Sequence, residues 1–235
     1  ASDGCVVLTN RDLDAVSVAY CPGLTPALIV AVTAAKTLAW AWQKPLIGVN
    51  HVHSHLQAVL LEQPQECFPC MALIVSGGHT SLYYCRSPLE MELAGKTSDD
   101  AAGEAFDKVA MILKLPYPGG PSIEKIARAG NPKAIDFPRT LMSKESLDFS
   151  FSGIKTAVLY HCRGQNMLGE DRAGAMSEAE KADIAASFQA AVVDVLITKT
   201  MRAARQYCAP SIVLVGGVAA NTALRTAFEQ RCVSE

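Results

Sequence analysis

In the N-terminal part of the chain, segments with the hydrophobic pattern of a β-strand alternate with segments that have the composition or spacing of a helix. Leu13–Tyr20 (LDAVSVAY) alternates apolar and polar side chains, which predicts a β-strand, and the Cys-Pro-Gly that follows predicts a turn. Thr25–Ala41 is rich in alanine, leucine and valine and predicts a buried helix. Leu46–Val49 predicts a short strand, and the histidine-containing segment His51–Glu62 predicts a second helix.

A hairpin with a glycine tip is expected next. Met71–Ser76 (MALIVS) is a continuous apolar run, which predicts a buried strand. Gly77 and Gly78 predict a tight turn, and His79–Cys85 predicts the returning strand.

The C-terminal part is mainly helical around one further strand. Helices are expected over Asp99–Lys114 and Ser122–Ala129, with a loop over residues 131–153. Ser177-Glu-Ala-Glu180 is a capping box that predicts the start of a long helix ending near Tyr207.

The last strand is expected at Ser211–Val215, followed by a turn at Gly216-Gly217 and a helix over about Ala219–Gln230. The mixture of helices and strands predicts a βα lobe followed by a second, larger lobe.

Composition narrows the class of protein only slightly. The 235 residues are 50% hydrophobic and 19% charged, with a net charge of −2 and a pI near 6.2, so a folded core is expected and no global basic surface for nucleic acid. No signal peptide is expected from the first residues. No membrane-spanning helix is expected either, because polar residues interrupt the stretch Leu24–Trp42.

Eight cysteines without a secretory signal favour a reducing compartment. Cys67 and Cys70 have the C-x-x-C spacing of a redox pair or of half a zinc site. No second pair follows, so coincidence is the simpler interpretation of this spacing.

Three histidines, in the segment HVHSH, divide into a pair and an outlier. In a helix, His51 and His55 project from one face, whereas His53 points away. Two neutral imidazoles at this spacing can chelate one transition-metal ion. The alternative is a pair of polar residues in the first turns of an ordinary helix.

Two strand–Gly-Gly elements are candidate anion sites. Glycine lets backbone N–H groups approach a phosphate closely, both at Gly77-Gly78 and at Gly216-Gly217, where a helix follows. Either element alone is equally consistent with a plain turn, but two in one chain suggest a nucleotide held between two lobes.

Acidic residues crowd the helix predicted to begin at Asp99. Asp107 follows Glu104 on the same face and could bind ribose hydroxyls, although a solvated acidic face is the alternative, and Glu104 with Lys108 forms an i,i+4 pair. Ser152 and Lys155 match S-x-x-K, but the other motifs of serine acyl-enzymes are missing, so Ser152 is interpreted as a helix N-cap.

Six ordered motifs resemble those of one family. From Leu13 to Arg225 the chain is similar to the TsaD/YgjD family of tRNA threonylcarbamoyltransferases, once described as O-sialoglycoprotein endopeptidases, and it fits the bacterial or organellar branch best. The motifs are His51-x3-His55, VSGGHTSL, DDAAGEAFDKVA, YPGGP, LDFSFSGIKTA and VGGVAANTALR.

The resemblance implies an α/β fold of the two-lobed ASKHA (actin/Hsp70/sugar-kinase-like) type, incomplete at both termini. Residues 1–70 would be the remainder of the N-terminal lobe with the His-x3-His helix. Residues 71–235 would be the second lobe, with helical insertions and nucleotide-binding Gly-Gly turns. Two family features are not found: a first strand of the type GIETSCD, and a later aspartate that supplies a third metal ligand.

The resemblance implies transfer of threonylcarbamoyl from threonylcarbamoyl-AMP to N6 of the adenosine 3′ to the anticodon in tRNAs reading ANN codons. No protein nucleophile is assigned. Two alternatives are a non-catalytic ASKHA scaffold or partner subunit and a metallo-glycopeptidase. The second lacks the HExxH glutamate, because Val52 stands at that position.

The resemblance also assigns residues and ligands. His51 and His55 would bind one divalent metal, Fe(II) or Zn(II). The glutamate at position 124 stands where many relatives carry an aspartate. The residues implied for threonylcarbamoyl-AMP or ATP are Ile74, Val75, Ser76, Gly77, Gly78, Asp107, Gly120, Glu124 and Asn221.

The implied partners are tRNA and, in a bacterium, a TsaB-like ASKHA subunit and a TsaE-like ATPase; an organellar member would form a homodimer. No membrane association is implied. The expected location is the bacterial cytoplasm or an organelle. Lys144, Lys155 and Arg163 are candidate tRNA contacts.

Overall fold

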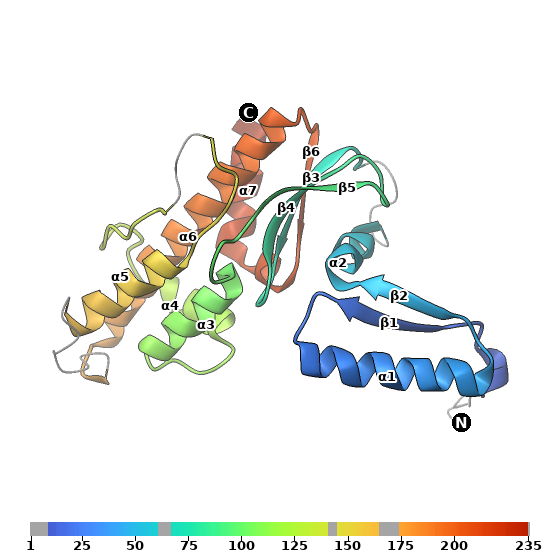
Figure 1. Ribbon diagram of the computed structural model, residues 1–235. Coiled ribbons are helices and arrows are strands. Elements are labelled where there is room, and N and C mark those ends of the chain that lie inside the picture. The colour runs from blue at the N-terminus through green and yellow to red at the C-terminus, as the bar shows by residue number, and fades with distance from the viewer. Residues whose placement is uncertain (1–8, 61–66, 141–144, 165–173, 235) are drawn as a thin grey trace, which may run out of the picture. The chain divides into compact units, whose positions relative to one another are not determined.

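The computed structural model describes residues 9–60, 67–140, 145–164 and 174–234, and the chain divides into two compact units, Ala1–Glu62 and Gln63–Glu235 (Figure 1). The order of helices and strands follows the predicted α/β pattern. The predicted lobe boundary after residue 70 stays a prediction.

The first unit is a β-α-β-α segment. A short 3-10 helix, η1 (Asn10–Asp12), precedes β1 (Val16–Cys21), and α1 (Thr25–Trp42) connects β1 to β2 (Leu46–Asn50). β1 and β2 pair in parallel, as a helical crossover allows. α2 (His51–Leu60) follows β2 directly, and the part of its predicted range that ends at Glu62 lies outside the described residues.

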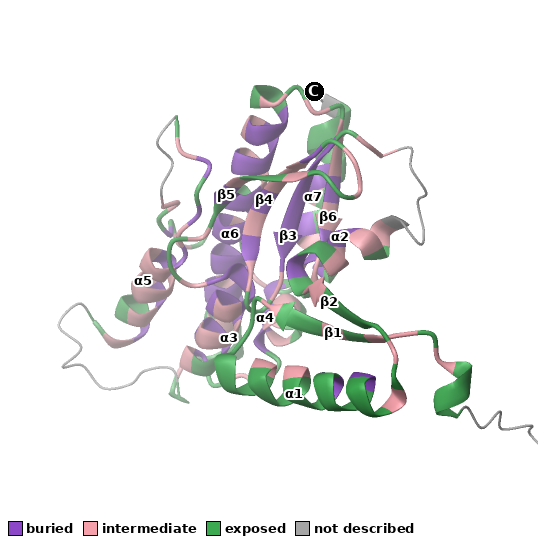
Figure 2. Ribbon diagram, turned by 45° about the vertical axis from the view of Figure 1, so that its right-hand side comes forward, coloured by how far each residue is buried: buried purple, intermediate pink, exposed green. Residues whose placement is uncertain are grey.

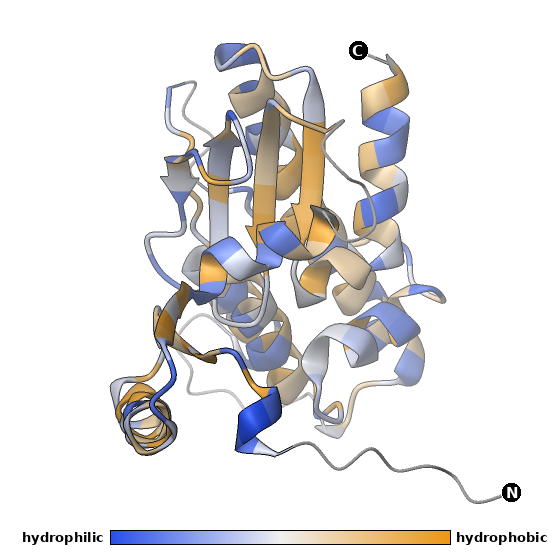
Figure 3. Cartoon of the chain, turned by 90° about the vertical axis from the view of Figure 1, so that its right-hand side faces the viewer, coloured by the Kyte–Doolittle hydropathy of each residue, from blue (hydrophilic) through white to orange (hydrophobic). Residues whose placement is uncertain are grey.

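The prediction that α1 is buried was wrong. Only Ala35 and Ala39 are buried, whereas Ile29, Val30 and Trp40 are 61%, 71% and 78% exposed. Figure 2 shows α1 mainly as exposed, and Figure 3 colours much of the same helix as hydrophobic. The reason is geometric: α1 packs mainly against the single strand β1 of a two-stranded sheet, which leaves most of the helix surface exposed.

α1 and α6 (Glu178–Gln206) both have the length and apolar composition of a helix that could cross a membrane. In α6, 83% of that window is buried inside the second unit, which identifies it as a core helix; in α1 the share is 11%. The expectation that no segment spans a membrane stays a prediction.

The second unit is built on a four-stranded sheet of order β5-β4-β3-β6. The strands are β3 (Cys70–Val75), β4 (Thr80–Cys85), β5 (Met91–Lys96) and β6 (Ser211–Val215). The predicted β3–β4 hairpin is confirmed, and β6 pairs with β3 in parallel. β5 was not predicted, because it lies at the edge of the sheet, half-exposed, without a continuous apolar run.

Five helices and a 3-10 turn, η3 (Gly217–Ala220), complete the described part of this unit. The helices are α3 (Ala102–Ile112), α4 (Gly119–Ala127), α5 (Ser152–Arg163), α6 and α7 (Thr222–Ser234). Three predicted starts were wrong: α3 begins after Asp100, α4 begins at Gly119, and η3 precedes α7.

α6 organises the core. The predicted capping box is confirmed: Ser177 Oγ accepts from Glu180 N at 3.2 Å, and Glu180 accepts from Ser177 N at 2.9 Å. Seventeen residues of the helix are buried, and Phe188 meets Phe106 of α3 edge-to-face at 5.1 Å. This packing holds α3, α4 and α6 together beside the sheet (Figure 1).

Candidate nucleotide site

Glycines let three turns of the second unit approach one another closely. A Cβ on Gly103, at the start of α3, would lie 2.6 Å from the carbonyl oxygen of Ser76. A Cβ on Gly216 would lie 2.3 Å from the carbonyl oxygen of Val75, and Gly216 also has a φ of +101°, in the region that favours glycine. The end of β3 therefore approaches both the end of β6 and the start of α3 closely at glycines.

A pocket of about 280 Å³ lies where these turns meet. Its volume is close to the lower end of the range of ligand pockets, ~300–1,000 Å³. Its lining is mostly apolar, with a few polar groups and no lysine or arginine: Gly77, Gly103, Phe106, Asp107, Tyr117, Pro118, Gly120, Pro121, Glu124, Gly217, Val218, Ala220 and Asn221.

Three of the lining glycines keep the pocket open. A Cβ added to Gly77, Gly120 or Gly217 would meet no atom within 4 Å, so these positions need no glycine for packing. Each of the three therefore presents backbone without a covering side chain to the pocket that it lines. This is the arrangement expected of a backbone cradle.

Asp107 connects the pocket to the start of α4. Its Oδ1 accepts from the N–H of Gly119 at 2.7 Å, and a Cβ on Gly119 would lie 2.5 Å from Asp107 Cα. Only Oδ1 makes this bond among the described residues, so Oδ2 can accept from a ligand hydroxyl. The two glycines of the YPGGP motif therefore have different roles: Gly119 packs on Asp107, and Gly120 lines the pocket.

Asn221 and Glu124 also line the pocket, and each accepts a hydrogen bond from a backbone N–H in the first turn of α7. Asn221 is the helix cap, with Oδ1 accepting from Leu224 N at 3.0 Å. Glu124 Oε1 accepts from Thr222 N at 3.1 Å and from Arg128 at 3.4 Å. Burial raises the pKa of Glu124, but the bonds from Thr222 and Arg128 outweigh burial and leave this pKa below its ordinary value. Glu124 is therefore ionised at neutral pH.

The charge of the pocket indicates which part of a nucleotide each wall suits. Two carboxylates, Asp107 and Glu124, favour hydroxyl or amine donors and repel phosphate. Phosphate or acyl oxygens are better accommodated at the backbone of Gly77 and Gly217, where N–H groups can donate to them.

The structure thus brings five of the nine predicted substrate residues around one pocket: Gly77, Asp107, Gly120, Glu124 and Asn221. Ile74 and Val75 are both fully buried in β3, and Val75 packs in the hydrophobic core of the unit. Ser76 and Gly78 lie beside the pocket lining, and Ser76 Oγ accepts from His79 N at 3.1 Å within the hairpin turn. Ligand contact by any of these residues stays a prediction.

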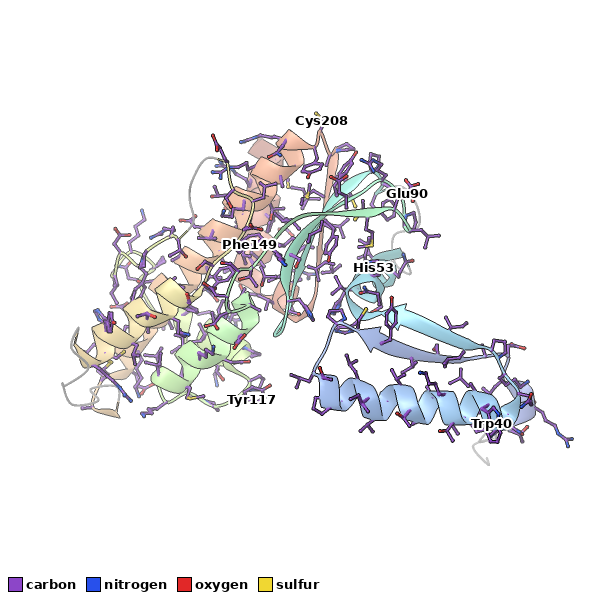
Figure 4. All side chains as sticks on the ribbon, in the orientation of Figure 1. Trp40, His53, Glu90, Tyr117, Phe149 and Cys208 are labelled. Carbon is purple, nitrogen blue, oxygen red and sulfur yellow. The ribbon has the colours of Figure 1, made fainter. Side chains whose placement is uncertain are left out.

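Sequence reasoning missed two aromatic side chains of the lining. Both line the pocket: Phe106 is buried, and Tyr117, which is labelled in Figure 4, is 84% exposed. Tyr117 belongs to the YPGGP motif, so the sequence contained a feature that could have identified it as a pocket residue. An exposed aromatic ring at the edge of a pocket is suited to stack on a base.

The predicted position of Asp99 and Asp100 on a helix was wrong, since both precede α3. Asp99 instead caps α5: Oδ1 accepts from Phe151 N at 2.8 Å, and Oδ2 accepts from the hydroxyl of Ser152 at 2.7 Å. Burial raises the pKa of Asp99, but these bonds and one from Ser150 outweigh burial and lower it. The helix N-cap position is Phe151, so the N-cap assignment of Ser152 was wrong by one residue.

Asp100 joins α3 to α5 through two lysines. Lys108 Nζ lies 2.6 Å and Lys155 Nζ 2.8 Å from the Asp100 carboxylate, and the predicted Glu104–Lys108 pair is confirmed at 2.8 Å. Lys155 is thus engaged with Asp100 and Ser152 with Asp99, which leaves no serine–lysine catalytic pair. Lys144 lies outside the described residues.

The histidine pair lies in the first unit, on α2. The rings of His51 and His55 lie side by side with centroids 4.7 Å apart and planes tilted by 59°, as i,i+4 spacing predicts for two neighbours on one helix face. Asn50 Oδ1 caps the helix by accepting from Val52 N at 2.9 Å and His53 N at 3.3 Å. Two imidazoles so placed fit as two ligands of one metal. The described residues contain no group of three or more metal-binding side chains.

The C-x-x-C pair lies at the start of β3. Cys70 is buried opposite Cys85 in the β3–β4 pairing, and a hydrogen bond with Cys85 together with burial raises its pKa. Burial also raises the pKa of Cys67. Protonated thiols are poor nucleophiles, which agrees with interpreting the spacing as coincidence.

The fold by itself indicates the structural class of the chain. It resembles the crystal structure of T. kodakarensis HypF with a TM-score of 0.59 at 14% identity, over 94% of this chain and 36% of that one. At this identity the similarity concerns the fold alone, and it is consistent with the expected ASKHA-type α/β fold.

The sequence then identifies the family. Residues 5–234 match TsaD, tRNA N6-adenosine threonylcarbamoyltransferase, and the chain belongs to this family. A protein of that name from Moorella thermoacetica is 54% identical over 218 residues, 93% of this chain and 62% of its own length. Another, from Clostridium botulinum strain Hall, is 49% identical over 224 residues, 95% of this chain and 64% of its own length. The chain therefore spans less than two thirds of these relatives.

Proposed function

We propose that this chain carries the nucleotide-binding part of a tRNA N6-adenosine threonylcarbamoyltransferase. The observation that supports the proposal is the single pocket that gathers Gly77, Asp107, Gly120, Glu124 and Asn221 from motifs far apart in the sequence. Family membership supplies the reaction, and neither the scaffold nor the glycopeptidase alternative is favoured by the names of the relatives.

The pocket would hold threonylcarbamoyl-AMP by its nucleoside part. The Asp107 and Glu124 carboxylates would accept from the ribose hydroxyls. The backbone at Gly77 and Gly217 would hold the phosphate or acyl oxygens, and Tyr117 would stack on a base at the rim. Fixing the donor in this way removes orientational freedom before reaction, which can lower a barrier by up to ~7–11 kcal/mol in ideal cases.

The chemistry needs no protein nucleophile. The N6 amine of the acceptor adenosine attacks the carbamoyl carbonyl carbon, the bond from that carbon to the phosphate oxygen breaks, and AMP leaves with the bonding electron pair. The amine loses one proton, which the leaving phosphate or water accepts. His51 and His55 would hold a divalent metal, Fe(II) or Zn(II), and such a metal polarises bound oxygens as a Lewis acid.

Several finer assignments belong to the same proposal. The acceptor would be tRNA, as the name of the relatives states for those proteins. The partners would be a TsaB-like subunit and a TsaE-like ATPase, or a second copy in an organellar member, and the location would be the cytoplasm or an organelle. Family membership is what supports these assignments.

The test supplies the chain with threonylcarbamoyl-AMP and a tRNA transcript that carries adenosine 3′ to its anticodon. Mass spectrometry of the digested tRNA then measures threonylcarbamoyladenosine. We expect product with the wild-type chain and at least tenfold less with Asp107→Ala. Adenylate binding without product would support the scaffold alternative, and cleavage of a glycoprotein substrate would support the peptidase.

A further inference from the structure

Gln189 is a polar residue in the most apolar part of α6. It is 9% exposed, and its neighbours in the helix include the fully buried Phe188 and Ala191. Burying a primary amide is unfavourable unless its polar atoms are hydrogen-bonded. The described partner of Gln189 is the pocket residue Asn221, whose Nδ2 donates to Gln189 Oε1 at 2.8 Å.

The orientation of both amides follows from the backbone. Leu224 N–H is a donor, so the atom of Asn221 that it meets at 3.0 Å must be the oxygen Oδ1. The Asn221 NH2 group must then point the other way, toward Gln189, which has to present an oxygen. The order of donors and acceptors thus runs without ambiguity from α7 through Asn221 to α6.

Gln189 itself stands outside the nucleotide pocket. Asn221 lines that pocket, whereas Gln189 lines a separate hollow of about 400 Å³ between α4, α6 and α7. Glu124 lines both spaces, and the described hydrogen bond that connects Gln189 to the nucleotide pocket is the one with Asn221. Asn221 is only 7% exposed, so water is poorly placed to replace a lost acceptor.

We infer that Gln189 is a positioning residue of the nucleotide pocket, which holds the Asn221 amide in the orientation that both caps α7 and forms the pocket wall. Without the Gln189 acceptor, the buried NH2 group of Asn221 stays unpaired or rotates away and breaks its bond to Leu224. The inference deepens the proposed function and rests on it, because the pocket is taken to hold an adenine nucleotide.

A set of variants distinguishes loss of the Asn221 orientation from a general destabilisation of α6. Gln189→Met keeps the length of the side chain and removes the strong acceptor, with Gln189→Leu as a second such variant should the first not fold. Gln189→Glu keeps an acceptor oxygen, whether ionised or protonated. Ser187→Ala is the matched control: Ser187 is also polar and 1% exposed on α6, but its hydroxyl bonds Asn131 and Ile135.

Calorimetric titration with AMP measures the effect on binding. We expect Gln189→Met to raise the Kd about tenfold, which corresponds to ~1.4 kcal/mol and to one net hydrogen bond. Gln189→Glu should restore the Kd to within about threefold of wild type, and Ser187→Ala should lower the melting temperature without changing the Kd. In an Asn221→Ala background, Gln189→Met should add nothing, because the residue through which it acts is already missing.

Hydrogen exchange at the Leu224 amide, measured without nucleotide, provides the second readout. Gln189→Met should speed this exchange about tenfold, and Ser187→Ala should not. Wild-type Kd in Gln189→Met, or an effect that adds to that of Asn221→Ala, would overturn the inference. A wild-type chain that binds no AMP would instead contradict the proposed function, while exchange at Leu224 would still decide whether Gln189 holds Asn221.

Discussion

The two units of this chain build their candidate sites in different ways. In Gln63–Glu235 a buried strand, β3, and a buried helix, α6, support a pocket whose walls come from four separate motifs. In Ala1–Glu62 α1 packs mainly against the single strand β1, and the candidate metal site consists of two histidines on one short helix. The first arrangement gathers residues from distant motifs around one pocket, whereas the second places two candidate metal ligands side by side.

The largest expected effect is the difference in unfolding free energy lost by two substitutions, one in each unit. Phe188→Ala removes a fully buried ring that packs on Phe106 and should cost ~3–5 kcal/mol of unfolding free energy. Ile29→Ala shortens a side chain that is 61% exposed on α1 and should cost less than ~0.5 kcal/mol. Urea denaturation followed by circular dichroism measures both values, and similar costs would show that the α1 face is packed.

Metal binding in the first unit should depend on His51 and His55 and not on His53. His51→Ala and His55→Ala should each weaken Zn²⁺ binding at least ~10–100-fold, because each removes a direct ligand. His53→Ala, two residues along the same helix, should leave the affinity unchanged. Calorimetry with Zn²⁺ is the measurement. An equal loss in all three variants would mean that the helical register of the pair is wrong.

The smallest expected effect is a pH dependence in the second unit. The pKa of Glu124 is lower when folded than its ordinary 4.5, so ionised Glu124 stabilises the fold above that value. This contribution is lost as the pH falls through the lowered pKa. Glu124→Gln should therefore cost ~1 kcal/mol at pH 7, and the difference from wild type should shrink below about pH 4.5. A difference that stays constant from pH 7 to 3 would contradict this role.

Local signals in the sequence predicted much of the second unit. The apolar run of β3 and the Ser177–Glu180 capping box each specify an element through neighbouring residues, and the structure confirms both. The histidine pair was separable from His53 for the same reason, because helical spacing is local.

Features that depend on distant contacts could not be predicted. Asp99 was assigned to a helix because its partners, Phe151 and Ser152, lie more than fifty residues away. No role could be predicted for Gln189, because only the fold brings it next to Asn221. The burial of α1 was inferred from its composition, but burial depends on how many strands cover a helix, and composition does not reveal this.

The central claim, that the pocket of the second unit holds an adenine nucleotide against a glycine backbone, has a direct test in two neighbouring residues. Gly77 and Gly78 share one turn, and a Cβ on either meets no atom within 4 Å, but only Gly77 lines the pocket. In calorimetric titrations with AMP, we expect Gly77→Ala to bind about tenfold more weakly than wild type, ~1.4 kcal/mol, and Gly78→Ala to bind as wild type does. Equal affinity of the two variants for AMP would contradict the claim.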